Sequence, residues 1–84
     1  MDAFRVKPGL DLSRLDHVTG RARALNLSLG ALCVRAGAHF GTIRRWEKGE
    51  TTPLLTTYER EMAKLESALA QEEARLTRAL EAGR

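Results

Sequence analysis

A chain of 84 residues has room for one small domain, near the lower size limit at which a hydrophobic core is stable unaided. Its composition, 43% hydrophobic and 30% charged, excludes an intrinsically disordered chain, and the single cysteine, Cys33, excludes an internal disulfide and a cysteine-based zinc site. Leucine, alanine, arginine and glutamate are common, while β-branched and aromatic residues are scarce, so an all-α fold is predicted.

Charge is distributed unevenly along the chain. The net charge is +3, but residues 1–50 hold nine Lys/Arg against five Asp/Glu, whereas residues 51–84 hold five against six. This asymmetry favours a polyanion as the partner of the front part and a protein as the partner of the rear part. The first residues, MDAFRVKPG, lack the apolar stretch of a secretory signal, and no apolar run approaches the ~20 residues of a membrane span. We therefore expect a cytoplasmic protein with no membrane partner.

The first expected elements are an N-terminal arm and one helix. Residues 1–10 form the arm, because they contain a Pro-Gly pair that breaks regular structure. Asp11 or Ser13 is expected to cap a helix that runs to about Leu25 and contains Gly20, which weakens it by up to ~1 kcal/mol. The apolar residues of this helix recur at helical spacing: Leu15, Val18, Ala22 and Leu25.

Two short helices are expected next. Ser28 is a second N-cap candidate, and Gly37 lies where a glycine ends the helix that Ser28 begins. A third helix begins near His39 or Phe40 and ends at Gly49.

A long C-terminal helix completes the chain. From about Leu54 to Ala82 nothing interrupts the helical pattern, and Pro53 suits the start of a helix. If it is continuous, this helix is on the order of 40 Å long. Its apolar residues step mostly by three and four, as in a coiled-coil seam, with Glu72 at one seam position. They are Leu55, Tyr58, Met62, Leu65, Leu69, Leu76 and either Ala79 or Leu80.

The stretch SLGALCVRAGAHFGTIRRWEKGETTP contains two short helices joined by a turn that begins with glycine. Its motif residues are Leu32-Cys33, Gly37, Ile43, Trp46-Glu47-Lys48-Gly49 and Pro53. In this spacing the chain resembles the Cro/repressor-type (Xre) family of helix-turn-helix proteins, over about residues 18–65. The resemblance implies a lambda-repressor-like domain with an extended C-terminal helix. Its parts are an arm at 1–10, a helix-turn-helix core at 11–53, and a long helix at 54–84 for packing and dimerisation.

The chain departs from the family pattern in three places. Cys33 stands where the family usually has alanine, and His39-Phe40-Gly41 opens the third helix where polar residues are usual. The long C-terminal helix also replaces the family's short fourth and fifth helices.

The resemblance further implies that the third helix enters the major groove of double-stranded DNA. The chain is then a sequence-specific transcriptional regulator, most simply a dimeric (auto)repressor of phage or mobile-element type. The residues implied for base contacts are Phe40, Gly41, Thr42, Arg44 and Arg45. Those implied for phosphate contacts are Ser28, Leu29, His39, Lys48, Thr51 and Thr52. Arg45 is the main candidate for a bidentate contact to guanine, whereas Phe40 is equally open to a role as a lid over the core.

Other charged residues are predicted to contact phosphate or to form ion pairs between helices. The arginines Arg21, Arg23 and Arg35 are further candidates for phosphate contacts. Glu47 is expected to pair with Arg21 or Arg23 and so to fix the first helix against the third.

The apolar stripe of the C-terminal helix predicts a homodimer, because a small monomer rarely exposes so much apolar surface. The residues expected at the dimer interface are Met62, Leu65, Leu69, Leu76 and Leu80. The alternative is that the helix folds back on the core, which is favoured for Leu55, Tyr58 and Leu65. A two-fold dimer predicts an operator that is an inverted repeat.

The sequence favours a binding protein over an enzyme. It contains no catalytic constellation, no phosphate-cradling glycine loop and no metal-ligand spacing, so neither a metal nor a cofactor is expected. The alternative function is a protein-interaction module or antitoxin, whose C-terminal helix binds a partner protein.

Overall fold

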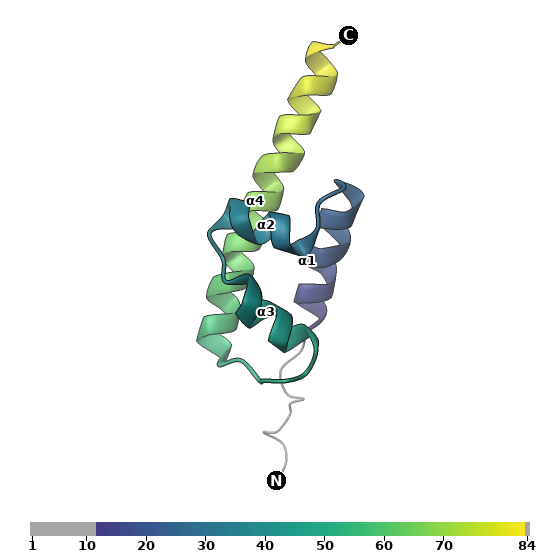
Figure 1. The fold of residues 1–84 in the computed structure, drawn as a ribbon. Helices are drawn as coiled ribbons and strands as arrows, with labels where there is room; N and C mark the ends of the chain where they lie inside the picture. The colour runs from purple at the N-terminus through teal and green to yellow at the C-terminus, as the bar shows by residue number, and fades with distance from the viewer. Residues whose placement is uncertain (1–11, 84) are drawn as a thin grey trace.

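The computed structural model describes residues 12–83, which form an all-α fold with a long C-terminal helix, as predicted (Figure 1). The helices are α1 (Ser13–Ala24), α2 (Leu29–Ala36), α3 (Phe40–Glu47) and α4 (Leu55–Ala82). The predicted arm at residues 1–10 and the predicted cap Asp11 lie outside the described residues.

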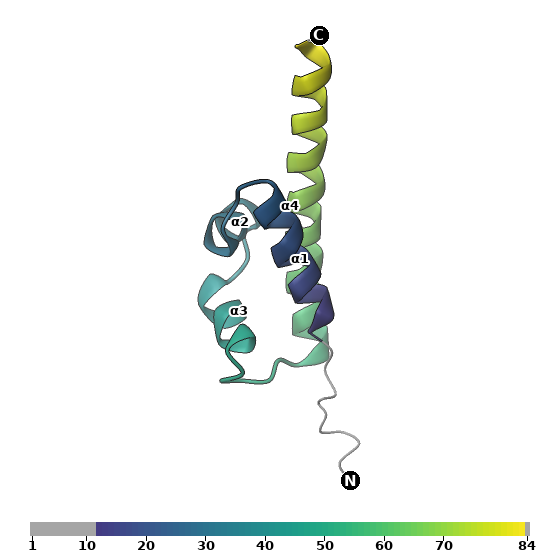
Figure 2. The ribbon, with the colours of Figure 1, turned by 90° about the vertical axis from the view of Figure 1, so that its right-hand side faces the viewer.

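Helix α4 is the longest helix, and both α1 and α2 pack against it. Helix α1 lies beside it and runs in the same direction, and α2 crosses it, as the two views in Figures 1 and 2 show. Helix α3 packs chiefly against α2. The last turns of α4 project beyond the three shorter helices, so α4 has a packed first half and an overhanging end.

Local signals set the boundaries of the short helices. The Ser28 hydroxyl accepts a hydrogen bond from the Ala31 amide at 3.1 Å, which confirms Ser28 as the cap of α2. Gly37 ends α2 with φ +71°, a left-handed conformation that favours glycine. His39 precedes α3 without a capping hydrogen bond from its side chain.

The start of α1 differs from the prediction. Leu12, rather than Ser13, occupies the N-cap position, and its side chain makes no capping hydrogen bond. The Leu15 amide instead donates to the Tyr58 hydroxyl of α4 at 3.2 Å, so one free N–H of the first turn is satisfied from another helix.

The hydrophobic core is shared by all four helices and therefore continues across the expected division between residues 53 and 54. Its members are Leu15, Val18, Ala22, Leu32, Cys33, Ile43, Trp46, Tyr58, Met62, Leu65, Ala68 and Leu69. The rings of Trp46 and Tyr58 lie with centroids 5.8 Å apart and join α3 to α4.

Two expectations for α4 are wrong. Met62, Leu65 and Leu69 have no exposed surface, because α1 and α2 cover them, so they are not free to form a dimer interface. For Leu65, as for Tyr58, burial confirms the alternative that the sequence favoured, in which this part of the helix folds back on the core. Leu55 was expected to fold back on the core but is 58% exposed. Beyond Leu69 the shorter helices no longer cover the stripe.

Arg–Glu pairs fasten α1 to α4. Nε and Nη2 of Arg14 each donate to an oxygen of the Glu66 carboxylate at 2.7 Å, and Arg21 pairs with Glu73 at 2.7 and 3.1 Å. The arginines are seven residues apart on α1 and the glutamates seven apart on α4, which aligns the two helices in parallel.

This arrangement overturns the predicted pairing of Glu47 with Arg21 or Arg23. Arg21 is engaged by Glu73, and the Glu47 carboxylate lies 4.0 Å from Arg44, one turn away on α3. Arg35 is also engaged, since it pairs with Glu72 at 2.7 Å.

The glycines of α1 and α2 lead to a stability prediction. Gly20 is exposed in the interior of α1, and a Cβ there would meet nothing within 4 Å, so Gly20→Ala should raise the free energy of unfolding by about 0.5–1 kcal/mol. Gly37→Ala should lower it by roughly 1–2 kcal/mol, because alanine is strained at a φ of +71°. Urea unfolding followed by circular dichroism measures both changes, and a Gly20→Ala variant no more stable than the wild type would contradict the account.

Candidate nucleic-acid interface

Helix α3 has one face in the core and one in solvent. Ile43 and Trp46 are buried, and they fix the orientation of the helix about its own axis. The opposite face carries a stripe of exposed residues with the helical spacing 0, 3, 4 and 7. These residues, which we call the α3 stripe, are Gly41, Arg44, Arg45 and Lys48.

The cationic groups of this stripe are accessible. The Arg44 side chain is 52% exposed, and its only ion pair among the described residues is the 4.0 Å contact with Glu47. The guanidinium of Arg45 extends back over Gly41, where a Cβ would lie 4.0 Å from Nη1. The glycine therefore leaves the backbone at the start of α3 uncovered beside an arginine.

The position of Phe40 is compatible with both roles predicted for it, a base contact and a lid over the core. It is 41% exposed, and its ring carbons lie 3.7–3.9 Å from the position of a Cβ on Gly30 of α2. The ring thus covers α2 with one side and presents the rest to solvent. Thr42, the remaining residue expected at the bases, is half-buried.

The residues expected at phosphates surround α3. Lys48, Thr51 and Thr52 are exposed in the segment that leaves α3, while Leu29 is half-buried at the start of α2. Ser28 is exposed, but its hydroxyl oxygen is engaged as the cap of α2. Phosphate contact by these residues stays a prediction.

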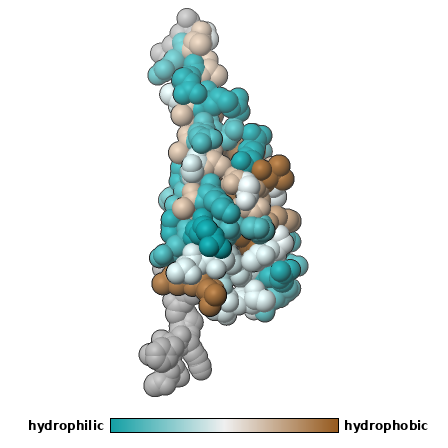
Figure 3. Space-filling view, turned by 90° about the vertical axis from the view of Figure 1, so that its left-hand side faces the viewer, coloured by the Kyte–Doolittle hydropathy of each residue, from teal (hydrophilic) through white to brown (hydrophobic). Residues whose placement is uncertain are grey.

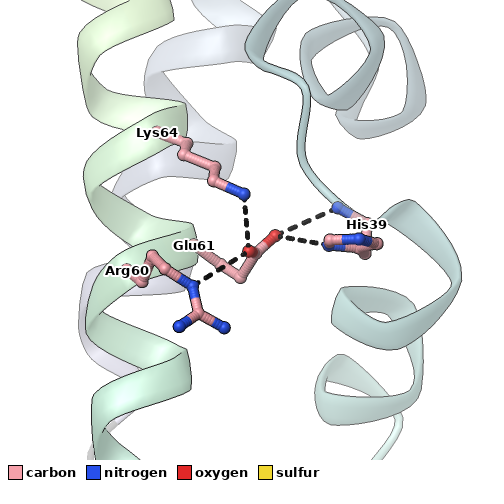
Figure 4. Close-up of polar contacts among 4 residues, drawn as sticks. All are labelled: His39, Arg60, Glu61 and Lys64. Atoms are coloured by element: carbon pink, nitrogen blue, oxygen red, sulfur yellow. Dashed lines mark hydrogen bonds and ion pairs between the residues drawn. The ribbon is translucent and has the colours of Figure 1, made fainter.

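A buried carboxylate that the sequence reasoning missed holds the start of α3 (Figure 4). Glu61 of α4 is 1% exposed and is the only buried charged residue in the described part of the chain. Its Oε1 accepts a hydrogen bond from the His39 amide at 3.0 Å and lies 3.3 Å from His39 Nδ1. Its Oε2 accepts from Lys64 Nζ at 3.0 Å and lies 4.0 Å from Arg60 Nε.

The charge on Glu61 is stabilised by these donors. Burial alone raises the pKa of this carboxyl, but the hydrogen bonds from His39 and Lys64 outweigh burial and hold the pKa below its ordinary value. A signal was present in the sequence, because Glu61 falls between Tyr58 and Met62 on the apolar stripe of α4. A charged residue at such a position needs partners to be buried.

The side chain of Cys33 is buried in the core. Burial raises the pKa of the Cys33 thiol to about 11, so Cys33 is a small core residue rather than a nucleophile. Within residues 12–83, His, Cys, Asp and Glu side chains form no group of three or more that is suited to a metal ion. No helix in this part of the chain combines the length and apolar character needed to cross a membrane.

Comparison of the chain with known protein families, characterised proteins and solved structures gives no match.

The Glu61 contacts predict an effect on stability. Glu61→Ala should lower the free energy of unfolding by about 1–3 kcal/mol, because the His39 amide loses its acceptor. The exposed neighbour Glu59 offers a matched control, and Glu59→Ala should change stability by less than ~0.5 kcal/mol. Equal effects of the two substitutions, measured by urea unfolding at neutral pH, would show that Glu61 holds nothing in place.

The same carboxylate predicts a pH dependence. Its pKa is lower in the folded chain than in the unfolded chain, so its stabilisation is present above about pH 4.3 and is lost as the pH falls through the lower folded value. Glu66, Glu72 and Glu73 behave in the same direction and remain in a Glu61→Gln variant. The stability difference between wild type and Glu61→Gln should therefore shrink on acidification, and a difference that grows would contradict the assignment.

Proposed function

We propose that this chain is a sequence-specific double-stranded DNA-binding protein, a transcriptional regulator similar to the Cro/repressor-type helix-turn-helix proteins. The observation that carries the proposal is the α3 stripe, Gly41, Arg44, Arg45 and Lys48, exposed opposite the residues that anchor α3 in the core. The major groove, about 12 Å wide, admits a helix and exposes base edges that arginine recognises.

Each residue of the α3 stripe has a distinct role in this proposal. Arg45 reads guanine O6 and N7 through two parallel hydrogen bonds, and Arg44 contacts a neighbouring base or phosphate. Gly41 lets the α3 backbone approach the base edges, while the exposed part of the Phe40 ring contacts a thymine methyl. Lys48, Thr51 and Thr52 hold the DNA backbone beside the groove.

The overhanging end of α4 supports a homodimer. Leu76 and Leu80 lie one turn apart, 47% and 64% exposed, on the part of α4 that no other described helix covers. A second copy that packs against this end gives two α3 helices related by a two-fold axis. In this proposal the two helices bind half-sites about one DNA turn, roughly 34 Å, apart on an inverted-repeat operator.

Binding to mixed-sequence duplex DNA tests the electrostatic part of the proposal. Lys48→Gln should weaken binding and reduce the slope of log K against log salt by about one phosphate contact, roughly 0.9. Arg78→Gln, at the far end of α4, removes the same charge and should leave the slope unchanged. Fluorescence anisotropy at several salt concentrations gives both slopes, and equal reductions in the two variants would mean that only net charge matters.

The dimer is tested by Leu76→Gln combined with Leu80→Gln, which leaves the Arg21–Glu73 and Arg35–Glu72 pairs in place. Sedimentation should show dimers for the wild type and monomers for this variant, which should also bind DNA less tightly. Leu54→Gln with Leu55→Gln alters two exposed leucines at the other end of α4 and should keep the dimer. A monomeric wild type would contradict the dimer.

A further inference from the structure

A groove separate from the α3 stripe runs between the end of α2 and the middle of α4. It has a volume of about 470 Å³. Its cationic residues are Arg35 of α2 and Arg60 and Lys64 of α4. Figure 3 views the molecule from the left-hand side of Figure 1, where α2 ends against α4, and hydrophilic residues predominate along α4 on this face.

Positive charge exceeds negative charge around the groove. Arg35 pairs with Glu72 at 2.7 Å, but Glu72 is shared with Arg75 at the same distance. Lys64 and Arg60 share the single carboxylate Glu61. Four cations thus face two carboxylates, and Arg60 and Arg35 keep 64% and 45% of their side chains exposed. The groove is therefore suited to a ligand that carries negative charge.

The groove is open to solvent and elongated along α4. Its α4 side extends from Arg60 to Gln71, which is about 16 Å along a helix axis. The α4 residues Ala63, Ser67 and Ala68 line it with small side chains, so a second backbone can approach closely. A length of about 16 Å matches three turns of helix, whereas a single phosphate would reach only one end of the row.

We infer that this groove binds an acidic peptide segment of a partner protein. Carboxylates of the segment pair with Arg60, Lys64 and Arg35, while Ser67 and Gln71 supply hydrogen bonds and the alanines accept its apolar side. Duplex DNA is a stiff rod that needs a broad cationic surface, and the lining of this groove is mixed apolar and polar. The inference does not depend on the DNA-binding proposal, because it involves different residues.

The test is a nuclear magnetic resonance titration of the isotope-labelled chain with a synthetic peptide of alternating Ala-Ala and Glu-Glu pairs, roughly 12 residues or about three turns long. The amides of Ala36, Ala63, Ser67 and Gln71 should shift progressively, while those of the α3 stripe stay in place. Shifts confined to α3, or no shifts at all, would overturn the inference. So would groove amides that respond to duplex DNA before those of α3.

Matched variants assign the binding to the groove. Arg60→Gln with Lys64→Gln should weaken peptide binding roughly 3- to 10-fold, the effect of two partly exposed ion pairs. Arg44→Gln with Arg45→Gln removes the same charge from α3 and should leave peptide affinity unchanged. Because the first variant also removes partners of Glu61, Ser67→Glu provides a second one, which adds a repelling charge to the groove at an exposed position and should weaken binding several-fold. Unchanged affinity in the Ser67→Glu variant would overturn the inference.

Discussion

The position of α3 depends on one buried carboxylate. Glu61 lies on α4 and accepts the amide hydrogen of His39, the residue immediately before α3. Helix α3 packs chiefly against α2, and the His39 side chain makes no capping hydrogen bond to it. The hydrogen bond from the His39 amide to Glu61 therefore attaches the start of α3 to α4. Trp46, near the other end of α3, packs with a tilted ring against Tyr58 of α4. These two contacts fix the position of each end of α3 relative to α4, and the buried side chains determine which face of α3 is exposed.

The proposed function requires that α3 be held in a fixed position. A bidentate arginine contact discriminates between bases only if the helix that carries it has a defined position. The α3 stripe is short and lies on an eight-residue helix that would be marginal by itself. The position of the α3 stripe therefore depends on the packing of α3 against α2 and the core and on its hydrogen bond to Glu61. Lys64, which also binds Glu61, belongs to the groove at the end of α2, so Glu61 contacts groups next to both the α3 stripe and the groove.

Much of the secondary structure was predictable from the sequence, because its signals are local. The Ser28 cap, the glycine after α2 and the unbroken helical pattern from residue 55 to 82 each depend on neighbours in the chain. The spacing of exposed and buried residues on α3 was predictable for the same reason. The start of α1 was not, because the group that satisfies the Leu15 amide is Tyr58, far away in sequence.

The tertiary pairs were harder to foresee. A heptad stripe on α4 predicts an apolar contact but not its partner, and α1 and α2 cover Met62, Leu65 and Leu69 before a second chain can. Likewise, Arg21 had Glu47 as an expected partner, yet the parallel alignment of α1 and α4 places it at Glu73. The seven-residue spacing shared by the arginines of α1 and the glutamates of α4 was a usable signal for that alignment.

The central claim, that the exposed face of α3 reads DNA, is tested most directly by selecting duplexes from a random pool on the purified protein and on Arg45→Ala in parallel. We expect the wild type to enrich an inverted repeat with half-sites about one DNA turn apart, and Arg45→Ala to lose a guanine preference in each half-site. A wild-type protein that enriches no sequence, or the same sequence enriched equally by both proteins, would contradict this account of α3.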